Sequence, residues 1–362
     1  MVVSLWGYYG FNYGDDIMME LFIDELTKKN AKVILVDSHA GNLKEKVKNR
    51  KNVEVIDFFH ISKKEKLKTL SWLAKTTDLN IWGGGTVFTD EDADGNFRFF
   101  LTLKLLGGRI GYISVGIGDM KRASRKLKTK VLIKLTSIIT LRDEKSYLTS
   151  KAINSNNSFH FEDVTYYYFN RYKTQSKKVA DHKRDNYLLV SFRSLKNYFG
   201  KEKEGKAADQ LAEIIPFLMK KHQFSQVIFL PLDVKDVEIN KKIQHSLDDS
   251  IKSQLMANSS VDEMTEMIRD SSIYISGRLH GSVASEFFGV PTISLSYSNK
   301  MNYFHESINF PYYIDLRKED ILLEKVETIL RVKKEVGQSD IKKEAVDKAY
   351  NNIDQLYRML GT

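Results

Sequence analysis

Short apolar runs alternate with longer amphipathic stretches along most of the chain. This alternation is typical of βαβ units, in which helices cover a parallel sheet of buried strands. In the first half, the pattern predicts strands over residues 2–7, 32–36, 53–57, 79–82, 109–115 and 138–142. Between them it predicts helices over residues 16–28, 64–74, 98–106 and 121–134. The fold class we expect is therefore α/β.

The rhythm breaks between residues 152 and 185, where polar and charged positions replace the apolar runs. A second series then begins, with strands predicted over residues 187–192, 226–231, 272–276 and 292–296 and a short one near 312–314. Helices are predicted over residues 207–221, 234–246, 261–270 and 282–288. The tail reads as two helices separated near Gly337. Because domains average about 100–200 residues, two domains are expected.

Composition limits the classes of partner and chemistry that the protein can have. The net charge of +9 favours an acidic partner, such as a phosphorylated substrate or an anionic membrane surface, and no nucleic-acid-binding motif is present. The absence of cysteine excludes disulfides and thiolate chemistry. No signal peptide is recognisable, and no apolar run reaches the roughly 18–20 residues of a membrane span. We therefore expect a cytoplasmic protein. The composition neither predicts nor excludes contact with the inner face of the membrane, and it does not indicate the oligomeric state.

The strongest motif is a glycine-bounded turn that follows one predicted strand and opens the next predicted helix. It reads Ser276-Gly277-Arg278-Leu279-His280-Gly281-Ser282. Glycines permit close ligand approach, and the free N–H groups of a helix N-terminus attract anions. The guanidinium of Arg278 suits phosphate or carboxylate, and His280 can move a proton near neutral pH. A purely structural turn is the alternative, and the pairing of both residues between glycines disfavours it.

Three weaker motifs also follow predicted strands. Asn12 and Asp15 lie in a glycine- and tyrosine-rich stretch and suit the hydroxyl groups of an acceptor, with helix capping by Asp15 or Asp16 as the alternative. Arg193 ends the first strand of the second half, where most arginines are simply solvated. The third motif is a run of glycines that lets the backbone approach a ligand, or forms a plain loop: Gly83, Gly84 and Gly85.

These motifs together resemble the polysaccharide pyruvyl transferase family. The resemblance covers residues 2–300 and rests on four segments in the expected order: Asn12-Tyr13-Gly14-Asp15, the glycine triplet, Arg193, and Arg278-Leu279-His280-Gly281. The segment Thr140-Leu141-Arg142-Asp143-Glu144-Lys145-Ser146 is similar to the family's Arg-acid-Ser segment at the end of the first domain.

The resemblance implies a GT-B-like fold of two facing, doubly wound Rossmann-type domains. Residues 1–165 would form the acceptor side and residues 186–320 the donor side, joined by a connection over 166–185. Residues 321–362 would form helices that return toward the first domain.

The resemblance also implies phosphoenolpyruvate as donor, and a product in which a pyruvate ketal bridges two hydroxyls of a sugar. The implied catalytic residues are His280, Arg278 and Arg193. The implied donor-binding residues are Arg193, Arg278, Leu279, His280, Gly281 and Ser282. The acceptor would contact Asn12, Asp15, Gly83, Gly84 and Gly85, and neither a metal nor a cofactor is expected. Such an enzyme would build an acidic polysaccharide of the bacterial cell envelope, such as a capsule or exopolysaccharide, and a lipid-linked oligosaccharide is one candidate acceptor.

The residues support this chemistry on physical grounds. Phosphoenolpyruvate carries a phosphate and a carboxylate close together, and two arginines with a helix N-terminus match that charge. His280 is either the acid that protonates the methylene carbon or the group that stabilises the departing phosphate. Because a turn arginine carries little packing, we expect Arg278→Ala to abolish donor binding with little loss of fold.

Two alternatives remain open. The first is a GT-B glycosyltransferase with a nucleotide-sugar donor, because the segment 287–293 resembles a Gly-x-Pro strand entry found there. Many retaining members of that class carry two glutamates ahead of the glycine, and the corresponding positions here hold Ser276 and Ala284. The second alternative is a non-catalytic binding protein of the same fold, which the retained Arg278 and His280 disfavour.

Overall fold

The computed structural model describes residues 1–362 except 91–93, 155, 176–184, 309–311, 337–342 and 362. The chain divides into a first unit, Met1–Arg171 with Lys343–Thr362, and a second unit, Tyr172–Lys342. The first part of the predicted connection over 166–185 is helical. A helix, α7 (Thr165–Gln175), occupies that part, and the boundary between units falls within it. Residues 176–184 of the predicted connection lie outside the described residues.

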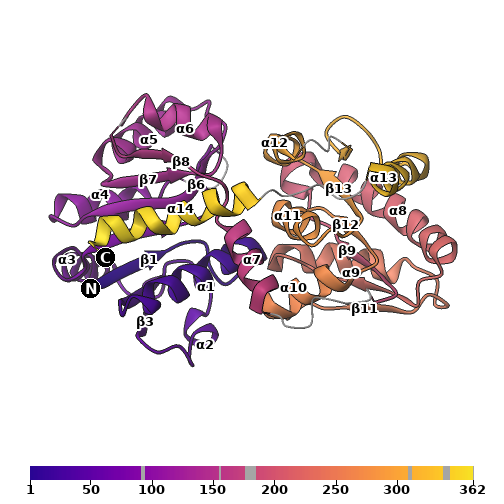
Figure 1. Ribbon diagram of the computed structural model, residues 1–362, viewed down its shortest axis with the longest axis horizontal. Coiled ribbons are helices and arrows are strands. Elements are labelled where there is room, and N and C mark those ends of the chain that lie inside the picture. The colour runs from indigo at the N-terminus through magenta and orange to yellow at the C-terminus, as the bar shows by residue number, and fades with distance from the viewer. Residues whose placement is uncertain (91–93, 155, 176–184, 309–311, 337–342, 362) are drawn as a thin grey trace. The chain divides into compact units, whose positions relative to one another are not determined.

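The first unit is built on one parallel sheet (Figure 1). Its strands run in the order β3-β2-β1-β4-β6-β7-β8, and β5 pairs with β6. Their bounds are β1 Val2–Trp6, β2 Lys32–Asp37, β3 Val53–Asp57, β4 Leu79–Gly83, β5 Thr86–Phe88, β6 Ile110–Ile117, β7 Ile138–Leu141 and β8 Ser158–His160. The helices between them are α1 Tyr13–Lys28, α2 Leu43–Lys46, α3 Lys63–Thr76, α4 Phe97–Leu105, α5 Ala123–Leu135 and α6 Glu144–Lys151.

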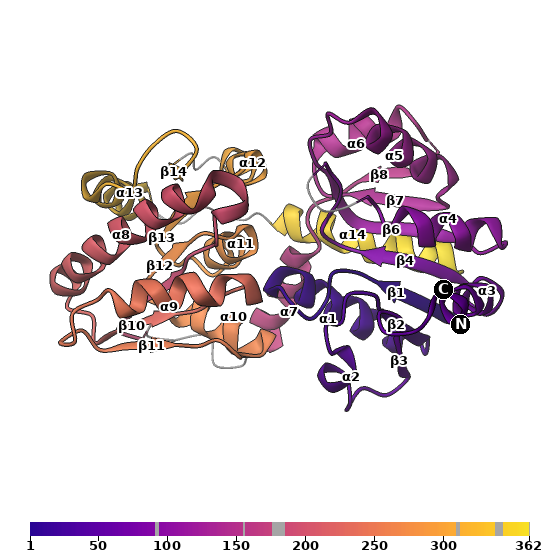
Figure 2. The ribbon, with the colours of Figure 1, turned by 180° about the vertical axis from the view of Figure 1, so that it is seen from behind.

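The last helix of the chain, α14 (Lys343–Leu360), belongs to the first unit, and Figures 1 and 2 show it lying across that unit's sheet. Buried polar groups fix it there. The hydroxyl of Thr140 in β7 donates to Asn352 at 2.6 Å, and the hydroxyl of Tyr357 donates to the Glu25 carboxylate at 2.9 Å. The preceding helix, α13 (Leu323–Val336), belongs to the second unit. Of the two C-terminal helices, α14 therefore returns to the first unit and α13 does not.

The second unit repeats the architecture with a six-stranded parallel sheet in the order β11-β10-β9-β12-β13-β14. Its strands are β9 Tyr187–Ser191, β10 Gln226–Phe229, β11 Ser253–Leu255, β12 Ile273–Ser276, β13 Thr292–Ser296 and β14 Ile314–Asp315. Its helices are α8 Lys196–His222, α9 Val237–His245, α10 Val261–Asp270, α11 Leu279–Phe287, α12 Asn299–Ser307 and α13. The core of this unit lies between the sheet and these helices, where the strand residues Leu188, Val227, Ile275 and Ile293 are buried.

Each sheet reverses its strand order once, and these reversals position the candidate sites. In the first unit the chain proceeds from β1 toward β3 and then crosses back to β4, so the reversal lies between β1 and β4. In the second unit it lies between β9 and β12. Ligands of open α/β sheets bind beyond the carboxyl ends of the strands at such a switch point.

None of the helices within the described residues is both long enough and apolar enough to cross a membrane.

Candidate active site

The glycine-bounded turn lies at the switch point of the second unit. Ser276, the last residue of β12, pairs in register with Ser191, the last residue of β9, so the two strands end side by side. The N–H of Gly277 donates to the carbonyl of Ser191 at 2.7 Å, and a Cβ on Gly277 would lie 2.8 Å from the backbone nitrogen of Arg193. Only glycine fits this close approach. The structure thus brings Arg193 and the Arg278 turn together, as the sequence predicts.

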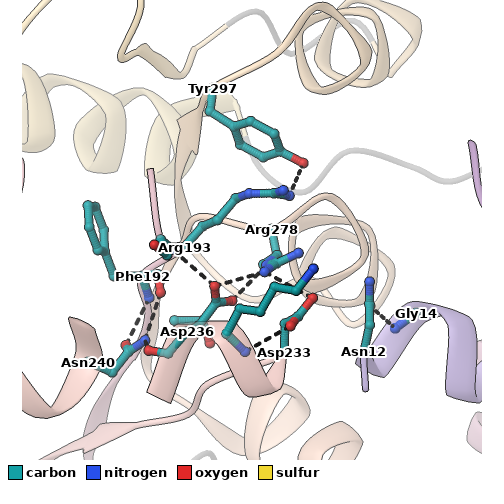
Figure 3. Close-up of polar contacts among 12 residues, drawn as sticks. Asn12, Gly14, Phe192, Arg193, Asp233, Asp236, Asn240, Arg278 and Tyr297 are labelled. Atoms are coloured by element: carbon teal, nitrogen blue, oxygen red, sulfur yellow. Dashed lines mark hydrogen bonds and ion pairs between the residues drawn. The ribbon is translucent and has the colours of Figure 1, made fainter. Parts of the chain in front are cut away.

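Arg278 is buried and held by two carboxylates that the sequence motifs do not include (Figure 3). Its Nε donates to Asp236 Oδ2 at 2.7 Å and its Nη2 to Asp236 Oδ1 at 2.8 Å. Nη2 also lies 3.1 Å from Asp233 Oδ2. Burial disfavours the charged form of Arg278, but Asp236 and Asp233 outweigh burial and raise the pKa of Arg278 above its ordinary value. The protein itself therefore compensates the charge of this arginine.

Arg193 lies in a different environment, between two tyrosine side chains. Its guanidinium carbon is 3.9 Å from the ring centre of Tyr297 and 4.7 Å from that of Tyr198. Nη2 donates to the hydroxyl of Tyr198 at 2.7 Å, and Nη1 donates to the hydroxyl of Tyr297 (Figure 3). The Nε of Arg193 is buried and has no hydrogen-bond partner among the described residues. This guanidinium thus keeps a donor for a ligand.

The segments that carry the two arginines are tied together by Asp236 and Asn240. The N–H of Ser194 donates to Asp236 Oδ1 at 3.0 Å, so the carboxylate that holds Arg278 also fixes the backbone next to Arg193. Asn240 in α9 exchanges two hydrogen bonds with the backbone of Phe192, one at 3.0 Å and one at 2.7 Å. The two arginine segments therefore belong to one network of hydrogen bonds.

The remaining donor-side candidates begin helix α11. Leu279 and His280 occupy its first turn and are half-buried. Gly281 is buried, and a Cβ there would lie 2.5 Å from the hydroxyl of Tyr274. Ser282 is fully buried, and its hydroxyl pairs with that of Ser294 at 2.9 Å. The structure thus commits Gly281 and Ser282 to packing within the unit, and it leaves His280 nearest to solvent among the polar residues of this turn.

The acceptor-side candidates meet at the switch point of the first unit. Asn12 is the N-cap of α1, and its Oδ1 accepts a hydrogen bond from the N–H of Gly14 at 2.9 Å (Figure 3). The hydroxyl of Tyr9 donates to the carbonyl of Gly83 at 2.9 Å, which joins the loop after β1 to the end of β4. A Cβ on Gly85 would lie 3.2 Å from the carboxylate of Asp15. Both predicted motifs therefore come together, with Asn12 serving as a helix cap.

Sequence comparison decides the family. The sequence model of the polysaccharide pyruvyl transferase family matches residues 12–299. The chain belongs to this family. The match begins at the cap residue Asn12 and includes Arg193, Arg278 and Tyr297. No curated protein sequence matches the chain.

Solved structures with the same fold come from another class of enzyme. The UDP-GlcNAc 2-epimerase from Methanocaldococcus jannaschii is 12% identical with a TM-score of 0.67, over 100% of this chain and 99% of that one. The UDP-GlcNAc 2-epimerase from Neisseria meningitidis bound to UDP-GlcNAc is 13% identical with a TM-score of 0.65, over 99% of both chains. A putative UDP-N-acetylglucosamine 2-epimerase from Listeria monocytogenes is 12% identical with a TM-score of 0.68, over 100% and 96%. At such identity the likeness shows the fold alone, which is GT-B-like with two Rossmann-type units.

Sequence reasoning missed four residues of the candidate site. Asp233 and Asp236 follow β10, and Tyr297 and Lys300 follow β13, each beyond a carboxyl end of the same sheet. Their position after predicted strands was the signal that could have found them. The two carboxylates escaped because an anionic donor calls for cations. Across the described residues, no cluster of His, Asp and Glu is arranged to hold a metal ion.

Proposed function

We propose that this protein is a phosphoenolpyruvate-dependent pyruvyl transferase that forms a pyruvate ketal across two hydroxyls of a sugar. The observation that carries the proposal is Arg193, whose buried Nε, at the switch point of the second unit, has no partner in the part of the chain that the structure describes. Phosphoenolpyruvate presents two anionic groups on one small frame. Arg193 and the N-terminus of α11 offer donors to both kinds of group.

The two arginines differ in role under this proposal. Arg278 is neutralised by Asp233 and Asp236, so it shapes the turn and presents the start of α11. Arg193 and Lys300 supply the positive charge that the donor needs. Lys300 is exposed in the first turn of α12, next to Tyr297. The donor would therefore bind mainly through Arg193.

The chemistry can be written so that atoms balance. A proton adds to the methylene carbon of phosphoenolpyruvate, and the adjacent carbon becomes oxocarbenium-like. One sugar hydroxyl attacks this carbon and loses its proton, which replaces the one delivered. The second hydroxyl then attacks the same carbon, the bond from that carbon to the phosphate oxygen breaks, and phosphate leaves with the second proton. We assign His280 to one of these proton transfers, as the acid or as the group that protonates the departing phosphate.

Thermal shift with phosphoenolpyruvate, UDP and GDP tests the donor. Phosphoenolpyruvate should raise the melting temperature of the wild-type protein, because a ligand that binds only the native state stabilises it. Arg193→Ala should lose this response, whereas Arg331→Ala, at an exposed position of α13, should keep it. Stabilisation by a nucleotide alone would overturn the proposal.

Phosphate release from phosphoenolpyruvate, measured against a panel of sugars, then identifies the acceptor.

A nucleotide-sugar enzyme is the second candidate, and the solved relatives favour including it in the test. One of them is bound to UDP-GlcNAc, and this chain shares its fold over nearly the whole length. Against this candidate, the positions of the two glutamates common in retaining glycosyltransferases hold Ser276 and Ala284, which are buried. UDP is therefore the most informative competing ligand.

We also infer that the acceptor is lipid-linked and that the first unit contacts an anionic membrane from the cytoplasmic side. The stretch 121–134 contains seven basic residues and no acidic one. Most of this stretch forms α5, whose exposed face presents Lys126, Lys130 and Lys134 with Leu127 between them. The other face of α5 is buried through Leu132 and Ile133. A basic face with an exposed apolar side chain suits the surface of a bilayer that contains anionic lipids.

A further inference from the structure

Tyr297 lies at the carboxyl end of β13, where positive charges from three elements surround its hydroxyl. Arg193 donates to that hydroxyl from the loop after β9. The ammonium group of Lys300, in the first turn of α12, is 5.9 Å from the centre of the tyrosine ring. Arg278, the N-cap of α11, acts on the phenol electrostatically. A side chain that is 3% exposed among these cations has no core-packing reason to be a phenol, because phenylalanine would fill the same space.

Tyr297 also controls the geometry of Arg193. The guanidinium packs on the ring of Tyr297 at 3.9 Å, while Tyr198, in the first turn of α8, receives Nη2 at 2.7 Å. The two tyrosines therefore fix the plane of the guanidinium, and its Nε is left as a donor with no partner among the residues that the structure describes. An anion that binds Arg193 must share this guanidinium with the Tyr297 oxygen.

We propose that Tyr297 is a positioning residue for Arg193, and that its ionisation state sets how strongly Arg193 binds the anionic donor. The proposal rests on the function proposed above, because it assigns Arg193 to the donor. A neutral phenol leaves Arg193 and Lys300 as uncompensated cations. An ionised phenol pairs with both and competes directly with a phosphate or carboxylate. Donor binding should therefore weaken as Tyr297 loses its proton.

The charges around Tyr297 place this change near neutral pH. Burial alone would raise the pKa of Tyr297, but Lys300, Arg193 and Arg278 outweigh burial and lower the pKa to about 8. The carboxylates of Asp233 and Asp236 face Arg278 and are engaged with it, and the hydroxyl of Tyr198 faces Arg193.

The first test measures the dissociation constant of phosphoenolpyruvate by calorimetry. If the donor binds only the neutral form, affinity should fall about tenfold between about pH 7 and about pH 9, by linkage of binding to one ionisation. Tyr297→Phe keeps the ring beneath Arg193 and removes the ionisable group, so its affinity should stay level over this range. Tyr198→Phe is the matched control and should keep the wild-type loss. An alkaline loss that survives in Tyr297→Phe, or a level wild-type profile, would overturn the proposal.

The second test follows the phenol itself through the ultraviolet absorbance of tyrosinate. The wild-type protein should show one tyrosine that titrates near pH 8, and this signal should be absent from Tyr297→Phe. Lys300→Ala removes an exposed cation without disturbing the core, and it should move the titration to higher pH. Phosphoenolpyruvate should do the same, because linkage is reciprocal.

UDP and phosphoenolpyruvate separate the two proposals in this titration. If UDP moves the titration of Tyr297 and phosphoenolpyruvate does not, the pyruvyl-transfer function fails and the role of Tyr297 at an anion site stands. If no tyrosine titrates near pH 8 although phosphoenolpyruvate binds, the role of Tyr297 fails and the function stands.

Discussion

Arg278 and Asp236 form a two-pronged ion pair inside the second unit, with Nε–Oδ2 at 2.7 Å and Nη2–Oδ1 at 2.8 Å. Asp236 is 1% exposed and Arg278 is 8% exposed, so bulk water solvates neither charged group appreciably. Asp233 adds a second buried carboxylate at 3.1 Å. A buried charge is tolerated only when it is paired, so each member of this group depends on the others.

Arg278→Ala should therefore destabilise the second unit by about 3–5 kcal/mol, because it leaves two buried carboxylates without their cation. This corrects the sequence-based expectation of little loss of fold, which assumed a solvated turn arginine. Denaturant unfolding followed by circular dichroism measures the effect. All three tryptophans, Trp6, Trp72 and Trp82, lie in the first unit, so tryptophan fluorescence reports that unit separately.

Two variants control for this result. Arg278→Lys keeps a positive charge but loses the forked geometry, so it should lose less stability than Arg278→Ala. Lys206→Ala breaks the exposed pair with Asp320 and should change the free energy of unfolding by less than about 1 kcal/mol. A loss in Arg278→Ala no larger than that in Lys206→Ala would contradict the structural role of the buried pair.

The sequence predicts both arginines of the candidate site and misses what distinguishes them. Strand-to-turn position predicts Arg193 and Arg278 at one end of the sheet, and the pairing of β9 with β12 brings them together. Burial and partners depend on residues that are distant along the chain. Asp236 precedes Arg278 by 42 positions, and Tyr297 follows Arg193 by 104. The sequence pattern around each arginine therefore does not show which of the two is neutralised by carboxylates.

Gly84→Ala should destabilise the first unit more than Gly107→Ala does. Both glycines have positive φ, 77° and 92°, so an alanine is strained at either position. A Cβ at Gly84 would lie 1.9 Å from the Sδ of the buried Met18, whereas a Cβ at Gly107 meets nothing within 4 Å. The difference between the variants therefore isolates the clash, for which about 1–3 kcal/mol is expected. Tryptophan fluorescence during denaturant unfolding measures it. Equal losses would show that backbone strain alone explains Gly84.

The fold itself was largely predictable, because buried parallel strands are continuous apolar runs and the helices between them are amphipathic. The strands that the sequence pattern did not predict are β5, β8 and β11, each three residues long. Ser158–His160 and Ser253–Leu255 lie at sheet edges and mix polar with apolar residues, so they carry no apolar run. Helix α6 was hidden by its polar composition, although Asp143 caps it through the N–H of Ser146 at 2.8 Å.

His280→Ala should slow turnover with phosphoenolpyruvate more than it weakens phosphoenolpyruvate binding. His280 lies in the first turn of α11, where it is half-buried and not part of the ion pairs that hold Arg278. An acid or base that acts in the transition state lowers kcat by about 100- to 10,000-fold when it is removed. Phosphate release gives kcat, and calorimetry gives the dissociation constant. Equal losses in both quantities would assign His280 to donor binding instead.

Charge reversal on α5 should release the protein from anionic vesicles. Each lysine near an anionic bilayer contributes about 1 kcal/mol, so losing the contributions of Lys126 and Lys130 should weaken binding at least roughly thirtyfold, and the introduced glutamates add repulsion. Co-sedimentation with vesicles of phosphatidylglycerol and phosphatidylcholine measures the effect for the double variant Lys126→Glu/Lys130→Glu. Leu127→Ser tests the apolar contribution separately, and it should weaken binding without changing the salt dependence.

The control for this experiment changes the same net charge elsewhere. Lys220 and Lys241 are exposed in the second unit, so Lys220→Glu/Lys241→Glu should bind vesicles as the wild-type protein does. Equal loss in both double variants would reduce the effect to overall charge and contradict a membrane face on α5. Two other outcomes would contradict it, because the lysines would then not be recognising an anionic lipid surface. The first is binding to pure phosphatidylcholine that is as strong as binding to mixed vesicles. The second is tighter binding to duplex DNA than to either kind of vesicle.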